Sequence, residues 1–139
     1  MISLDETQQI VYDSLIATCK EIENELSTSV NPNEPQYLQN QIEKLRTFLS
    51  HTPTLISGAS TLYDTAKRQC AEQIMKSSQL LDLKANVQKM WIDGEISQFN
   101  SLFLRVESVT KKLDKSIEAL VSQLSFEKEK IKNHIHSES

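Results

Sequence analysis

The stretch from Glu95 to Asn133 constrains the fold more than any other part of the chain. It contains no glycine and no proline, and apolar residues recur along it at alternating steps of three and four. This apolar seam consists of Ile96, Phe99, Phe103, Val106, Leu113, Ile117, Leu120, Leu124 and Ile131, with Thr110 and Glu127 at two further seam positions. Apolar residues at this spacing form a heptad pattern with apolar a and d positions. The pattern predicts a helix roughly 58 Å long, at ~1.5 Å per residue, that packs against other helices.

The composition agrees with an all-helical fold. Aromatic residues make up 6% of the chain, and it has two glycines and three prolines, which argues against a β-sandwich or a β-barrel. A chain of 139 residues is the size of one domain. The sequence therefore predicts a single helical domain over residues 1–139. We expect an all-α antiparallel helical bundle with a long, coiled-coil-like C-terminal helix.

Two signals bound the first helix. Ser3 and Glu6 match the capping box, in which a hydroxyl and a carboxylate satisfy backbone NH groups at a helix start. Helical spacing of apolar residues then predicts a helix from Leu4 to about Thr28. Prolines and asparagines between residues 29 and 35 interrupt it and start a second helix.

Later boundaries are marked by proline, serine and glycine. Thr52 followed by Pro53 is typical of a helix N-terminus, so the second helix is predicted to end near residue 50 and a third to begin at Pro53. Gly58 lies on that third helix and indicates a kink or a close contact. Residues 76–79 form either a turn or a bend, and Gly94 precedes the long last helix.

The charge is unevenly distributed. The formal net charge is −4, and residues 1–50 hold eight acidic against three basic residues, a net of −5. A protein that binds duplex nucleic acid needs a concentrated positive face to neutralise phosphates. The sequence therefore does not predict binding to duplex nucleic acid.

The cysteines and the N-terminus bear on the compartment. Cys19 and Cys70 have no CxxC spacing and no neighbouring metal ligands, which is typical of buried thiols in a reducing compartment. No basic start followed by an apolar run is present, and no stretch approaches the ~18 apolar residues of a membrane span. We expect a cytoplasmic protein without a membrane-spanning segment.

The sequence does not contain the common catalytic motifs. It lacks a glycine-rich phosphate loop and the GxSxG and HExxH patterns. His134 and His136 are two apart, so on a helix they point to different faces, and a metal site there is not predicted. His51 is interpreted as an exposed residue at a helix end. The expectation is a protein that is not an enzyme and needs no cofactor.

One group of residues is a candidate ligand site. Between Lys67 and Trp91 there are five basic and two acidic residues, a net of +3, and Tyr63 lies one helical turn before Lys67. If the helices pack antiparallel, these bases and those of the long helix could converge on an anionic nucleotide, with an aromatic ring to stack on its base. The predicted ligand residues are Tyr63, Lys67, Arg68, Lys111 and Lys115. The alternative is a solvated lysine face without a ligand.

The long helix is also a candidate oligomer interface. In its first half Leu102 and Val109 flank the seam, which suits burial against two or more helices. Beyond Leu124 the stripe thins, and a buried charge at Glu127 is costly unless it is paired. We therefore expect the seam from Ile96 to Leu124 to join copies of the chain, and the tail to project or to meet another subunit.

Three sequence motifs between roughly residues 33 and 130 carry a resemblance. They are Asn33-x-Pro35-x-x-Leu38-x-x-x-Ile42-x-x-Leu45-x-x-Phe48-Leu49, Tyr63-x-x-Ala66-Lys67 and Leu113…Ile117-x-x-Leu120-x-x-x-Leu124-Ser125-Phe126-Glu127-Lys128-Glu129. In these motifs the chain resembles small helical proteins encoded by tailed phages and mobile elements of gut bacteria. The resemblance implies a small phage accessory protein that acts by binding, in the host cytoplasm if phage-encoded. It assigns an activity to none of these residues.

These observations lead to two main hypotheses, with a hydrolase that uses an unrecognised pair of carboxylates as a third alternative. The first is a non-catalytic homo-oligomeric interaction or assembly protein, which acts through its exposed surface on a protein partner. The second is a protein that sequesters an anionic nucleotide signal at the basic helical patch.

Overall fold

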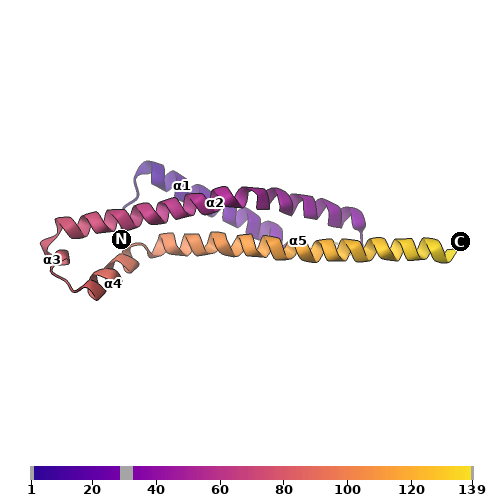
Figure 1. Ribbon diagram of the computed structural model, residues 1–139. Coiled ribbons are helices and arrows are strands. Elements are labelled where there is room, and N and C mark those ends of the chain that lie inside the picture. Colours follow the sequence, from indigo (N-terminus) through magenta and orange to yellow (C-terminus); the bar gives the residue numbers. More distant parts are fainter. Residues whose placement is uncertain (1, 29–32, 139) are drawn as a thin grey trace. The chain divides into compact units, whose positions relative to one another are not determined.

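The computed structural model describes residues 2–28 and 33–138, with side chains described as far as residue 134 (Figure 1). The helices are α1 (Glu6–Leu26), α2 (Pro35–Lys76), α3 (Ser78–Leu81), α4 (Ala85–Glu95) and α5 (Ser97–Glu138). No strand occurs among the residues in these ranges. The predicted all-α helical bundle with a long C-terminal helix is confirmed.

The helices form two compact units. Unit 1 contains residues 1–19 and 53–107, and unit 2 contains residues 20–52 and 108–139. Helices α1, α2 and α5 contribute to both units, whereas α3 and α4 belong to unit 1 alone.

In unit 1, α1 packs against α2 and α5. A Cβ on Gly58 of α2 would lie 3.5 Å from the side chain of Leu15, and the ring of Tyr12 meets Phe99 of α5 edge-on, with 6.1 Å between ring centroids. The buried Ile2 lies near the end of α2, where it lines a hollow together with Ser3, Gln69, Glu72, Gln73 and Lys76. Residues early in the chain thus face residues late in α2, so α1 and α2 are antiparallel in this unit.

In unit 2, α2 and α5 form an antiparallel pair. Leu38 and Ile42 of α2 are buried with Leu124 of α5, and Leu120 and Val121 pack at the edge of this cluster. A neighbouring hollow joins later residues of α2 to earlier residues of α5, and its lining is Leu26, Thr28, Gln41, Leu45, Ser116, Ala119 and Leu120. Residue numbers therefore rise along α2 as they fall along the facing part of α5.

The predicted helix boundary at Thr52 and Pro53 is wrong. Helix α2 runs without interruption through Pro53. A proline has no N–H, so the carbonyl of Leu49 loses its usual helical donor four residues later. The hydroxyl of Thr52 donates to that carbonyl at 2.8 Å. The Thr52 hydroxyl thus replaces the backbone donor that Pro53 lacks, and the helix continues through this position instead of a new helix starting there.

The first helix begins later than predicted, and a different pair caps it. The Asp5 N–H donates to the side-chain oxygen of Gln8 at 3.0 Å, and the Gln8 N–H donates to the Asp5 carboxylate at 2.7 Å. This is the reciprocal geometry of a capping box, formed two residues after Ser3. Ile2 is buried, which holds the segment before the helix against the core of unit 1.

The junction before the long helix also differs from the prediction. Gly94 lies inside α4, and Ile96 separates α4 from α5. The alternative left open at residues 76–79 is settled as a turn, because α2 ends at Lys76 and Ser77 caps α3.

The buried stripe of α5 departs from the predicted seam in its first half. Leu102 and Val109 are buried, whereas Phe103 and Thr110 are only partly buried. The seam residues Val106 and Leu113 are buried as well, so the buried face of this half includes both seam residues and the residues that flank them. From Leu113 to the buried Ile117 the predicted seam continues.

Candidate interaction surfaces

Three of the predicted ligand residues lie together on α2 in unit 1. Lys67 and Arg68 are exposed and Tyr63 is partly buried. The Lys67 ammonium lies 5.0 Å from the centroid of the Tyr63 ring, which is a cation–π contact between residues one helical turn apart. One face of the predicted stacking ring is therefore in contact with a cation of its own helix.

The other two predicted ligand residues lie in unit 2. Lys111 and Lys115 are exposed on α5. The convergence of these lysines with Lys67 and Arg68 on one ligand stays a prediction.

The predicted oligomer seam is covered by helices of the same chain. In unit 1 Phe99 contacts Tyr12, and in unit 2 Leu124 is buried with Leu38 and Ile42. Ile96, Val106, Leu113 and Ile117 are also buried within the single chain, while Phe103 and Leu120 are partly buried. The role of this seam in joining copies stays a prediction, because burial inside one chain already accounts for its apolar residues.

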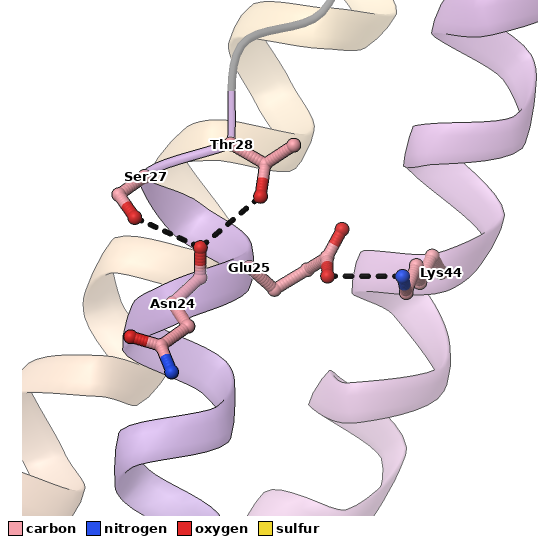
Figure 2. A network of polar contacts seen from close by, with 5 residues as sticks. All are labelled: Asn24, Glu25, Ser27, Thr28 and Lys44. Atoms are coloured by element: carbon pink, nitrogen blue, oxygen red, sulfur yellow. Dashed lines mark hydrogen bonds and ion pairs between the residues drawn. The ribbon is translucent and has the colours of Figure 1, made fainter.

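A polar network closes the end of α1 in unit 2 (Figure 2). The hydroxyls of Ser27 and Thr28 both donate to the Asn24 carbonyl, at 2.8 and 3.1 Å. Beside them the Lys44 ammonium of α2 lies 2.9 Å from the Glu25 carboxylate. This hydrogen bond lowers the pKa of Glu25 below its ordinary value. The contacts terminate the helix and fix it to α2, which is a structural role.

Polar and thiol groups gather near the start of the chain in unit 1. The side-chain oxygen of Gln69 is buried beside the hollow that Ile2 lines, and no hydrogen-bond partner reaches it. The neighbouring Cys70 is fully buried, and burial, with the nearby carboxylate of Glu95, raises the pKa of its thiol. A thiol in this state is a poor nucleophile.

Two polar side chains, those of Ser77 and Gln88, set the turns between α2 and α4. The Ser77 hydroxyl accepts from the Leu80 N–H at 3.2 Å. The side-chain amide of Gln88 donates to the carbonyls of Leu80 and Leu81, at 3.0 and 3.2 Å. Gln88 therefore joins α4 to the end of α3 and sets the turn between them.

Helices α3 and α4 have no buried side chain, and several large apolar side chains are exposed in and around them. Exposed fractions reach 73% at the end of α2 and 70% in α4, and the exposed apolar residues here are Met75, Leu81, Leu83, Val87 and Met90. Leu83, Val87 and Met90 recur at helical spacing in the sequence, and the structure places all three at the surface.

The end of α5 carries a second, smaller set of exposed apolar residues. Past Leu124, α5 continues beyond the start of α2 (Figure 1), and Phe126 and Ile131 are exposed. Glu127 is only 5% exposed; Gln123 donates to it at 2.9 Å and the Lys130 ammonium lies 3.7 Å away. These contacts within α5 compensate the charge that the sequence placed on the seam.

No protein family, curated protein or solved structure matches this chain. In the part that the structure describes, no group of three or more His, Cys, Asp or Glu residues is placed to hold a metal ion. Within the same residues, none of the helices combines the length and the apolar character that crossing a membrane requires. His134 lies on the exposed end of α5, and the side chain of His136 lies outside the described residues.

Proposed function

We propose that the protein is a non-catalytic interaction protein that assembles with itself through helix–helix contacts. The observation that supports this most directly is the segment from α3 to α4, which has no buried residue yet exposes large apolar side chains. Exposed apolar side chains concentrated in one segment are typical of protein contact sites.

The helicity of α4 favours the same interpretation. It has 11 residues, and isolated helices shorter than ~12–15 residues are marginal in water. Most helices of this length are stabilised by burying one face, whereas α4 keeps only partly buried residues against its own chain. A partner that covers the remaining apolar residues would supply the missing burial.

The test is the mass of the untagged protein in solution. Native mass spectrometry and light scattering should detect oligomers whose masses are integer multiples of 15.9 kDa, at least twice that of one chain. The fraction of chains in these oligomers should rise with protein concentration. A mass of one chain at about 100 μM, a hundredfold above a dissociation constant of ~1 μM, would refute self-assembly. A multiple that carries additional small-molecule mass would favour the second hypothesis instead.

Sequestration of an anionic nucleotide is the second candidate function. It is supported by the exposed cations Lys67 and Arg68 beside the partly buried Tyr63. A K67E/R68E variant should lose binding in equilibrium dialysis against a panel of nucleotides and keep its helical circular dichroism. A K128E/K132E variant, altered at exposed lysines near the end of α5, is the matched control. Equal nucleotide uptake by both variants would contradict a site at Lys67.

The setting implied by the resemblance is part of the same proposal. A phage accessory protein that acts by contact needs a stable surface and no active site. Self-assembly through short exposed helices is compatible with that role.

A further inference from the structure

Four features of α4 count against its stability as an isolated helix. Its N-cap residue, Lys84, makes no side-chain cap hydrogen bond. It has no acidic residue in its first turn and no basic residue in its last turn, although these are the positions where the helix dipole favours charge. Gly94 lies in its last turn, where glycine has a low helix propensity. The sequence of α4 is thus not optimised for a helix that stands alone.

The helix has an inner and an outer face. Gln88, Trp91, Ile92 and Glu95 are partly buried and follow the i, i+3, i+4, i+7 spacing of one helical face. The remaining positions point outward, with Met90 and Asn86 near the centre and Val87 at one edge. We define the outer face of α4 by six exposed residues, which are Asn86, Val87, Lys89, Met90, Asp93 and Gly94.

Charge on the outer face is self-complementary. Lys84 and Lys89 lie at the start and in the first half of α4, and Asp93 lies near its end. When two such helices pair in antiparallel orientation, Lys89 of one copy faces Asp93 of the other, and the same contact occurs twice. The antiparallel helix dipoles add to this attraction. Lys84 near the N-terminus and Asp93 near the C-terminus interact unfavourably with the dipole of their own helix. In an antiparallel pair, each of these charges lies nearer the helix end of the partner that attracts it.

The shape of the outer face permits close approach. A Cβ added at Gly94 would meet nothing within 4 Å, so the surface over this residue is open. Met90 is 70% exposed, and an unbranched thioether side chain adapts to irregular gaps. Met90 of one copy can therefore pack in the space above Gly94 of the other.

We infer that the outer face of α4 is the interface through which two copies of this chain meet, antiparallel about a two-fold axis near the middle of the helix. This inference rests on the proposed self-assembly and names its surface. A two-fold interface uses the same patch on both copies, which the paired lysine and aspartate satisfy. An anionic lipid surface would require an excess of basic residues, which this balanced face lacks.

Mixing two charge-reversed variants tests the inference. K89E and D93K each place like charges across the interface, and each should raise the dissociation constant roughly tenfold or more. An equimolar mixture pairs the introduced glutamate of one variant with the introduced lysine of the other, so heterodimers should form more tightly than either homodimer. Native mass spectrometry with one variant isotopically labelled measures the three species. Lys89 and Asp93 are also one turn apart within α4, but mixing cannot repair a like-charge pair within one helix.

Two further variants test the role of Met90 near the centre of the outer face. M90E should abolish the dimer, and L104E is its matched control, because Leu104 is an exposed apolar residue in unit 1 on a different helix. Far-ultraviolet circular dichroism and the fluorescence of the single Trp91 verify that each variant is folded.

The outcomes separate the inference from the proposed function. A wild-type protein that stays a single chain overturns both. An oligomer that survives in M90E, or a mixture of K89E and D93K with no preference for the heterodimer, overturns the α4 interface and leaves self-assembly intact. Binding of the wild type to anionic vesicles, with no dimer in solution, would replace the second copy with a membrane surface and overturn the inference.

Discussion

The hydrogen bond between Thr52 and the Leu49 carbonyl predicts how a substitution at Thr52 in α2 changes the free energy of unfolding. Thr52 is 3% exposed, and its hydroxyl takes the place of the N–H that Pro53 lacks. The substitution Thr52→Val keeps the shape of the side chain but removes this donor. The Leu49 carbonyl then loses its partner in a part-buried hydrogen bond.

The size of the effect follows from hydrogen-bond energetics. A buried acceptor left without a partner costs about 1–3 kcal/mol, so Thr52→Val should lower the free energy of unfolding by about 1–2 kcal/mol. In a Pro53→Ala background the new N–H of residue 53 donates to the same carbonyl. The valine substitution should then cost under about 0.5 kcal/mol, and the double-mutant cycle should give a coupling of about 1 kcal/mol.

Urea denaturation at 25 °C measures the cycle. Far-ultraviolet circular dichroism follows all helices, and Trp91 fluorescence follows unit 1, so the two signals also show whether the units unfold together. A valine substitution that costs the same in the proline and alanine backgrounds would refute the argument. The helix would then pass through Pro53 for a reason other than the threonine hydroxyl.

Three further predictions concern packing and charge. Gly58→Ala should raise the free energy of unfolding by about 0.5–1 kcal/mol, because the added Cβ meets Leu15 at an ordinary 3.5 Å; a loss of stability in thermal denaturation would contradict this. The hydrogen bond from Lys44 keeps the pKa of Glu25 in the folded protein below its ordinary value. The stabilisation from this contact is therefore complete above the unfolded pKa and is lost as the pH falls through the folded pKa. Glu25→Gln should therefore cost about 0.5–1 kcal/mol in urea denaturation at pH 7 and progressively less in acid, and a cost independent of pH would exclude the ion pair as its source. Leu113→Lys should lower the free energy of unfolding by more than about 3 kcal/mol, measured by circular dichroism.

The sequence predicted the structure best where an apolar repeat continues over many residues. The seam between Ile96 and Leu124 predicted the last helix, because neither a strand nor a short helix carries an apolar repeat of that length. Pro53 misled the prediction, since Thr-Pro is compatible both with a helix start and with a threonine that bonds backward to a carbonyl. Only the coordinates of the Leu49 carbonyl distinguish the two.

The α3–α4 segment shows the other limit of sequence reasoning. Leu83, Val87 and Met90 recur at helical spacing, but Leu83 lies outside α4 and only Val87 and Met90 lie within it. Periodicity also does not say whether a face meets the core of its own chain. A signal was present in the charges: Lys84 and Asp93 stand at the helix ends where the dipole disfavours them. Such an arrangement points to stabilisation from outside the helix.

The Leu113 prediction separates the two surfaces that could join copies of the chain. Leu113 is 0% exposed within a single chain, so a lysine there disrupts the fold itself, and loss of the oligomer follows from unfolding. Met90 contributes nothing to a buried core, so a charge at that position changes assembly without changing helical content. If Leu113→Lys instead left the circular dichroism intact and only dissociated the oligomer, the seam would be an interface between chains. Comparing helical content and mass in the same two variants therefore decides which part of the sequence folds the chain and which part joins its copies.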